Sequence, residues 1–147
     1  MVFSKTVIYI YITFAKENKF NWDLQFWHKT NACPNHFNHL IVDTEYCIRI
    51  YTSGSYFNNE LTYRDYNKYF LENVQSIDGH PTPKPLRIIK SQLNVFSKKN
   101  DIILDCFLGS GTTAVACKQL GRKCLGIEIS EEYCKIARQR LAQEVLF

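Results

Sequence analysis

The stretch from Ile102 to Ser130 constrains the fold more than any other part of the chain, because apolar runs alternate there with helix-forming segments. The expected elements are, in order, a strand at 102–104, a glycine turn at 105–113, a helix at 113–120, a strand at 124–127 and a helix from 130. Gly121 is a natural helix stop, and Ser130 is a good N-cap with Glu131 and Glu132 behind it. Strand, helix, strand and helix at this spacing predict a parallel α/β sheet.

The turn Asp105-Cys-Phe-Leu-Gly-Ser-Gly-Thr-Thr113 joins the first of these strands to the first helix. Small residues in such a turn let the backbone approach a ligand and point N–H groups at it. Glu128 follows the next strand, 17 residues after Gly111, where the acidic side chain of a βαβ unit reaches the ribose hydroxyls of a cofactor. We therefore expect the carboxylates of Asp105 and Glu128 to flank one cofactor pocket.

Several ligands are compatible with a glycine turn of this kind. The spacing of Gly109, Gly111 and Ala114 would allow a nicotinamide or flavin dinucleotide. A nucleoside triphosphate is excluded, because Gly111 is followed by Thr112 with no lysine. The acid at Asp105 suits a cofactor that carries an ammonium and a sulfonium better than a pyrophosphate, which it would repel. A βα turn that binds no ligand is the remaining alternative.

The residues before this stretch predict a β-rich first half. We expect strands at 7–14, 24–28 and 45–51, a loop at 55–78, an irregular proline segment at 79–85 and a helix from about 86 to 95. The aromatic residues between 51 and 70, with Lys29, Arg64 and Lys68, either contact nucleic acid or pack locally.

Charge and cysteine usage limit the cellular setting of the chain. The net charge of +4 tolerates a polyanionic partner but does not by itself indicate DNA. The six cysteines form no C-x-x-C pair, which is typical of free thiols in a reducing compartment and predicts a cytoplasmic protein. No apolar run approaches the roughly 20 residues that span a bilayer, so no membrane segment is expected.

Three motifs together resemble the N6-adenine and N4-cytosine DNA methyltransferases. Residues 105–113 resemble the methionine-pocket motif of that family, and Gly126-Ile-Glu-Ile-Ser130 resembles its ribose-binding strand end. His80-Pro-Thr-Pro-Lys-Pro85 resembles its second cofactor motif. The position of this last motif before the glycine turn matches the β group, in which the catalytic half precedes the cofactor half.

The resemblance implies a fold, a cofactor and a reaction. The fold would be an incomplete Rossmann-like methyltransferase sheet with flanking helices, and the reaction a site-specific methylation of double-stranded DNA by S-adenosyl-L-methionine, as in restriction-modification systems. Phe107, Gly109, Gly111, Thr112 and Thr113 would hold the amino-acid end of the cofactor. The other cofactor-binding residues would be Asp105 and Ser110 in the same turn, Glu128 at the ribose, and His80, Thr82 and Lys84 at the far side of the cofactor.

One motif of the family is not found in the sequence. Its enzymes hold the flipped base with an Asp/Asn/Ser-Pro-Pro-aromatic loop. The four prolines here, Pro34, Pro81, Pro83 and Pro85, include no Pro-Pro pair, so no catalytic residue is assigned. We therefore expect an N-terminally truncated methyltransferase that is inactive alone. The alternatives are a non-catalytic cofactor- or DNA-binding subunit whose complementary chain carries the loop, and a nucleotide-cofactor oxidoreductase.

The expected organisation is one compact domain with three segments. These are a β-rich remnant of the catalytic half at 1–54, a recognition-region remnant at 55–79 and the S-adenosylmethionine-binding region at 80–147. His28, Cys33, His36 and His39 lie close together in the sequence, but their spacing is not one that metal sites commonly use. We expect no metal site.

Overall fold

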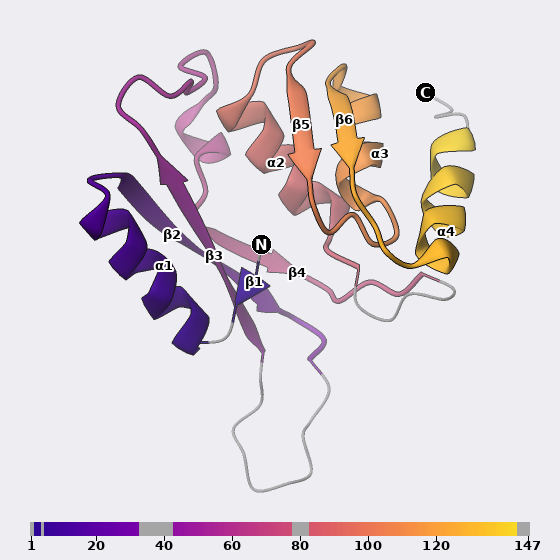
Figure 1. Ribbon diagram of the computed structural model, residues 1–147, viewed down its shortest axis with the longest axis horizontal. Coiled ribbons are helices and arrows are strands. Elements are labelled where there is room, and N and C mark those ends of the chain that lie inside the picture. The colour runs from indigo at the N-terminus through magenta and orange to yellow at the C-terminus, as the bar shows by residue number, and fades with distance from the viewer. Residues whose placement is uncertain (1, 4, 33–42, 78–82, 144–147) are drawn as a thin grey trace, which may run out of the picture. The chain divides into compact units, whose positions relative to one another are not determined.

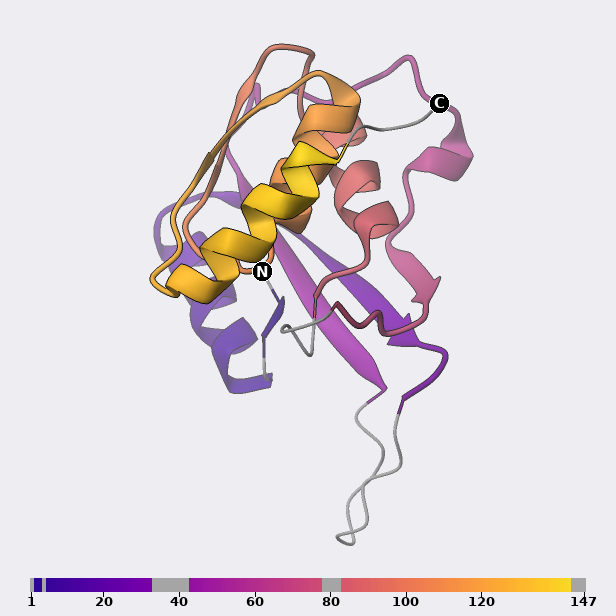
Figure 2. The same ribbon diagram turned by 90° about the vertical axis from the view of Figure 1, so that its right-hand side faces the viewer.

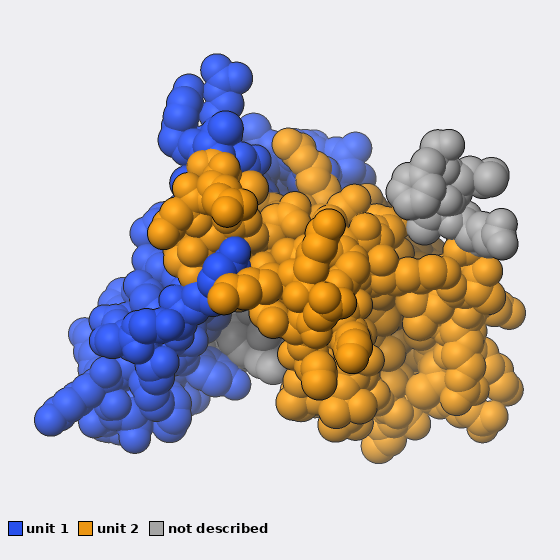
Figure 3. Space-filling view, turned by 90° about the horizontal axis from the view of Figure 1, so that it is seen from above, with its two compact units in different colours: residues 1–56, 62–73 blue, residues 57–61, 74–147 orange. Residues whose placement is uncertain are grey.

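The computed structural model of the chain describes residues 2–3, 5–32, 43–77 and 83–143 (Figure 1). The chain divides into two compact units. Unit 1 comprises residues 1–56 and 62–73, and unit 2 comprises residues 57–61 and 74–147 (Figure 3). The finer division into segments at 1–54, 55–79 and 80–147 stays a prediction.

Unit 1 contains a four-stranded sheet in the order β1-β3-β2-β4. The strands are β1 (Val2–Phe3), β2 (Asn21–Lys29), β3 (Thr44–Tyr51) and β4 (Tyr69–Glu72). The long pair β2 and β3 is antiparallel, and β4 runs parallel to β2. The expected strands at 24–28 and 45–51 are therefore confirmed; β2 extends beyond both predicted ends, and β3 begins one residue earlier than predicted.

The loop expected at 55–78 contains two short elements. A 3-10 turn, η1, covers Tyr63–Asp65, and β4 follows it. Four residues are too few for a period to be recognised in a sequence, so β4 could not be separated from the surrounding loop. Its hydrogen bonds to β2, which lies about 40 residues earlier in the chain, are what make it a strand.

The strand expected at 7–14 is wrong, because these residues belong to the helix α1 (Lys5–Glu17). Ile8 and Ala15 are buried, whereas Tyr9 is 72% exposed. Two buried positions seven residues apart share one face of a helix but would lie on opposite faces of a strand. A short apolar, β-branched run is compatible with a strand or a helix, so the sequence did not distinguish them. The helix also continues into polar residues that the sequence suggested were a break.

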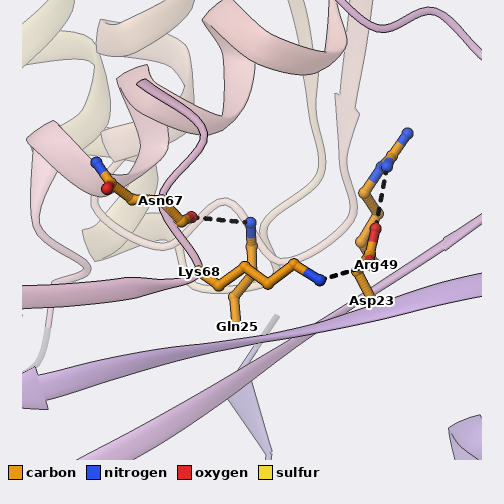
Figure 4. Close-up of polar contacts among 5 residues, drawn as sticks. All are labelled: Asp23, Gln25, Arg49, Asn67 and Lys68. Carbon is orange, nitrogen blue, oxygen red and sulfur yellow. Dashed lines mark hydrogen bonds and ion pairs between the residues drawn. The ribbon is translucent and has the colours of Figure 1, made fainter. Parts of the chain in front are cut away.

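A polar cluster links the strands of unit 1 (Figure 4). The Asp23 carboxylate on β2 accepts a hydrogen bond from Arg49 Nη1 at 3.4 Å and one from Lys68 Nζ at 3.0 Å. Gln25, which lies two residues after Asp23 on β2, donates a hydrogen bond from Nε2 to the Asn67 carbonyl at 3.4 Å. The Oε1 atom of Gln25 is buried and has no hydrogen-bond partner in the described part of the chain. The cluster thus ties β2 to β3 and to the segment before β4.

Unit 2 contains the alternating elements that the sequence predicts. They are α2 (Leu86–Phe96), β5 (Ile102–Asp105), α3 (Thr112–Leu120), β6 (Lys123–Gly126) and α4 (Glu131–Ala142). Strands β5 and β6 are parallel, as expected. Figures 1 and 2 show α2 and α3 on the same side of this strand pair. Both strands therefore end at one edge, from which the chain enters α3 and α4.

Small side chains allow α2 and α3 to pack closely on the strands. Leu93, Ala116 and Cys117 form the buried centre of unit 2, and Ile103 and Cys124 pack against it from the strands. Burial, and then the neighbouring Cys124, raise the pKa of the Cys117 thiol to about 12. The thiol is therefore a neutral core group at ordinary pH.

Both ends of α3 are set by glycines with left-handed backbone. Gly111 precedes the helix with φ 81°, and Gly121 follows it with φ 70°, which confirms the predicted helix stop. At the start of α4 the Ser130 hydroxyl accepts a hydrogen bond from the Tyr133 N–H at 3.3 Å, as expected for an N-cap. Among the described helices, none combines the length and the apolar character that crossing a bilayer requires.

Candidate cofactor site

The glycine turn between β5 and α3 is held by hydrogen bonds from its own backbone. The Phe107 N–H donates to Asp105 Oδ1 at 3.0 Å, and the Leu108 N–H donates to the Ile127 carbonyl at 3.0 Å. The Gly111 N–H donates to the Leu108 carbonyl, also at 3.0 Å. These bonds fasten the turn to the end of β5 and to the chain that leaves β6.

Glu128 connects the turn to the beginning of α4. Its Oε2 atom accepts from the Gly109 N–H at 2.7 Å, and its Oε1 atom accepts from the Ser130 N–H at 2.8 Å. A carboxylate held by both oxygens has a fixed orientation. Because Ile127 donates to the Asp105 carbonyl at 2.8 Å, the two strand ends that carry Asp105 and Glu128 are neighbours. The expected pair of acids is therefore brought to one edge of the strand pair.

Arg140, on α4, contacts the turn from the other side. Its Nη1 atom donates to the Ser110 carbonyl at 2.6 Å and to the Ser110 and Thr112 hydroxyls at 3.2 Å each. Burial lowers the pKa of the guanidinium. The sequence alone does not indicate this contact. Arg140 lies three residues after Ala137, on the same face of α4.

That face of α4 leaves no room for a side chain at Gly111. A Cβ atom at Gly111 would lie 2.8 Å from the Ala137 Cβ and 3.2 Å from the Ala137 Cα. Gly111 is thus required both by its positive φ and by the space that α4 leaves. Ala137 is itself buried, so this contact belongs to the packed interior of unit 2.

The structure gathers most of the predicted cofactor residues around the turn. Ser110 and Thr112 are buried, with their hydroxyls turned to Arg140, whereas Phe107 is 75% exposed. Lys84 is half-buried and lies between the fully buried Pro83 and Pro85. The predicted residues His80 and Thr82 lie outside the described residues. The cofactor role of each of these residues stays a prediction.

The hydrogen bonds of the turn distinguish between two classes of ligand that the sequence allowed, a dinucleotide and a cationic cofactor. A pyrophosphate is bound by N–H groups that point at it. Here four N–H groups of the turn already donate hydrogen bonds within the protein, those of Phe107, Leu108, Gly109 and Gly111. The Glu128 carboxylate also occupies the N–H of Gly109, where it would repel a phosphate. The site therefore fits a cationic cofactor with a ribose diol better than a dinucleotide.

Comparison with known proteins agrees with this chemistry. The family model for N6/N4 DNA methylases matches residues 2–139. The chain belongs to this DNA methylase family. The type II methyltransferase M2.LlaDCHI of Lactococcus lactis subsp. cremoris is 38% identical in an alignment that covers 78% of the chain and 48% of that protein. M2.DpnII of Streptococcus pneumoniae is 33% identical in an alignment that covers 80% of the chain and 50% of that protein.

A solved DNA methylase has the same fold. The crystal structure of the M1.HpyAVI complex with S-adenosylmethionine matches with a TM-score of 0.81 at 31% identity, over 97% of this chain and 72% of that one. The predicted methyltransferase family and its α/β fold are therefore confirmed. S-adenosylmethionine is confirmed as the cofactor of this family. The chain spans about half the length of the two curated relatives.

Other candidate sites in the sequence receive less support. Within the ranges that the structure describes, no three His, Cys, Asp or Glu side chains form a metal-binding group. Of the residues considered for a metal, Cys33, His36 and His39 lie outside those ranges. The two lysines considered for phosphate contact are ion-paired in unit 1: Lys29 with Glu45 at 2.7 Å and Lys68 with Asp23 at 3.0 Å.

Proposed function

We propose that the chain binds S-adenosylmethionine and takes part in site-specific methylation of adenine N6 or cytosine N4 in double-stranded DNA. The observation that carries the proposal is the Glu128 carboxylate, which is held at the end of β6 between the Gly109 and Ser130 N–H groups. An acid fixed beside a glycine turn whose N–H groups are already used suits a ribose and a cationic centre. The free cysteines agree with a cytoplasmic setting.

The residues have distinct proposed roles. Glu128 binds the ribose hydroxyls, while the backbone of 109–113 and the exposed ring of Phe107 hold the amino-acid end. Asp105 contributes negative charge near the cofactor's cationic groups. Lys84, with His80 and Thr82, contacts the far side. When bound, S-adenosylmethionine supplies an electrophilic methyl group, and the chain's own task is to hold and orient it.

Methyl transfer also needs a group that holds the target amine. The 147-residue sequence has no Pro-Pro dipeptide, so it lacks the loop that performs this task in the family. We infer that these 147 residues bind the cofactor but do not methylate DNA alone, and that a complementary chain with the loop would restore transfer. The net charge of +4 is compatible with contact to the DNA backbone.

Calorimetry with S-adenosylmethionine and with NAD tests the cofactor assignment. The wild-type chain is expected to bind the first and not the second. In Glu128→Gln the amide can accept only one of the two N–H groups, and a lost hydrogen bond to a charged group corresponds to a roughly tenfold to hundredfold weaker affinity. Glu132→Gln is the matched control, because Glu132 is exposed in the first turn of α4. Preferential binding of NAD would overturn the assignment.

A methyl-transfer assay tests the second part of the proposal. The chain and a fragment of a family member that contains the Pro-Pro loop but lacks the cofactor-binding motifs are incubated with labelled S-adenosylmethionine and duplex DNA, each alone and together. We expect incorporation of label only in the mixture. Methylation by the purified chain alone would show that residues other than a Pro-Pro loop hold the base.

A further inference from the structure

Arg140 is half-buried, and the three oxygens that accept from its Nη1 are all neutral. Burial lowers the pKa of the guanidinium. Among the described residues no carboxylate is paired with it, so hydrogen bonds to neutral oxygens must offset the hydration that it loses. Arg140 also lies at the first residue of α3, Thr112, where the helix dipole favours anions. The contacts given for this side chain among the described residues are therefore all made to the glycine turn and the start of α3.

The contact of Arg140 fixes one peptide group in the glycine turn. The carbonyl of Ser110 accepts from Arg140 at 2.6 Å, and the N–H on the other side of the same peptide, that of Gly111, donates to the Leu108 carbonyl at 3.0 Å. The two groups point in opposite directions across a trans peptide, so holding both prevents the peptide from rotating. Glycines on both sides of Ser110 would otherwise allow that rotation at little cost.

We propose that Arg140 is a positioning residue for the cofactor: from behind the turn it holds the peptide between Ser110 and Gly111 so that the turn is preformed for the amino-acid end of the ligand. The inference rests on the function proposed above. It assigns to α4 a part in the site that the motif residues 105–113 and Glu128 do not include. Its positive charge additionally favours a ligand that presents a carboxylate to the start of α3.

The expected loss of affinity depends on the fraction of molecules whose turn has the binding conformation. If the turn without Arg140 adopts its binding conformation only about one tenth of the time, the measured affinity falls about tenfold. A ligand without the amino-acid portion does not need this part of the turn, so its affinity should change little. A residue that merely filled space would be replaced by methionine without such a difference between ligands.

The experiment measures the affinity of the full chain for S-adenosylmethionine and for 5′-methylthioadenosine, which lacks the amino-acid portion. The variants are Arg140→Met, which keeps the length of the side chain, and Arg140→Lys, which keeps the charge and some donors. Arg138→Met is the control, because Arg138 is exposed two residues earlier on the same helix. Far-UV circular dichroism confirms that each variant is folded, and Arg140→Lys serves the comparison if Arg140→Met is not.

We expect Arg140→Met to bind S-adenosylmethionine about tenfold more weakly, 5′-methylthioadenosine almost unchanged, and Arg140→Lys to lie between it and the wild type. Equal affinities in Arg140→Met and the wild type, or equal losses for both ligands, would overturn the inference while leaving the proposed function in place. A wild-type chain that binds neither ligand would overturn the proposed function and this inference with it.

Discussion

Replacing Gly111 by alanine tests the close contact between the glycine turn and α4. The new Cβ would lie 2.8 Å from the Ala137 Cβ, and the residue would keep a φ of +81°. Alanine in the left-handed region costs roughly 1–2 kcal/mol, and forcing a methyl group into a packed interior costs roughly 1–3 kcal/mol more. The lower conformational entropy of the unfolded alanine chain returns about 0.4–1 kcal/mol. We expect Gly111→Ala to destabilise unit 2 by about 1–5 kcal/mol in sum.

Gly121→Ala measures the cost of a positive φ without the steric contact to α4. Gly121 closes the same helix with a φ of +70°, but the nearest atom to a Cβ there is Lys99 Cγ, at 3.9 Å. This variant should therefore lose only about 1 kcal/mol. Native-state hydrogen exchange of the α3 amides gives the free energy of opening for each variant. Adding Ala137→Gly to Gly111→Ala removes the 2.8 Å contact but leaves the Ala137 Cα at 3.2 Å and places a glycine inside α4, so it should recover only part of the difference.

Equal destabilisation of α3 by Gly111→Ala and by Gly121→Ala would contradict this prediction. That result would mean that α4 moves away from the turn without loss, so the contact at Ala137 would not be part of a packed interior. It would also weaken the case that α4 presents Arg140 to a fixed turn, because both contacts come from the same face of the helix.

Two further predictions concern buried groups. Because burial raises the pKa of Cys117 from 9.0 to about 12, the unfolded chain loses this proton first, and stability should fall by up to about 1.4 kcal/mol per pH unit between those values. Cys117→Ala should remove that part of the slope in alkaline denaturation, and the exposed Cys106→Ala should not. Gln25→Met should change the urea stability of unit 1 by less than about 1 kcal/mol, because it removes both the 3.4 Å hydrogen bond to the Asn67 carbonyl and a buried oxygen without a described partner; a loss above about 1 kcal/mol would contradict this.

The elements around the glycine turn were predictable because each had a local signal. Gly121 ended a helix and Ser130 began one, and both positions are as expected. The strand expected at 7–14 failed because no local signal separated the two interpretations; α1 is defined by which positions unit 1 buries. Arg140 was missed for a related reason. Its acceptors lie 28 and 30 residues earlier and one of them is a backbone carbonyl, so the residue types alone do not reveal the pair.

The two hydrogen bonds of Glu128 also set a lower limit on the length of any fragment that keeps the geometry of the site. One oxygen needs the Gly109 N–H before β6, and the other needs the Ser130 N–H after it. Cutting the chain between β6 and α4 would leave a strand pair with a glycine turn but an acid free to rotate. A minimal piece for grafting the site onto another scaffold therefore begins at β5 and extends through α4 at least to Arg140.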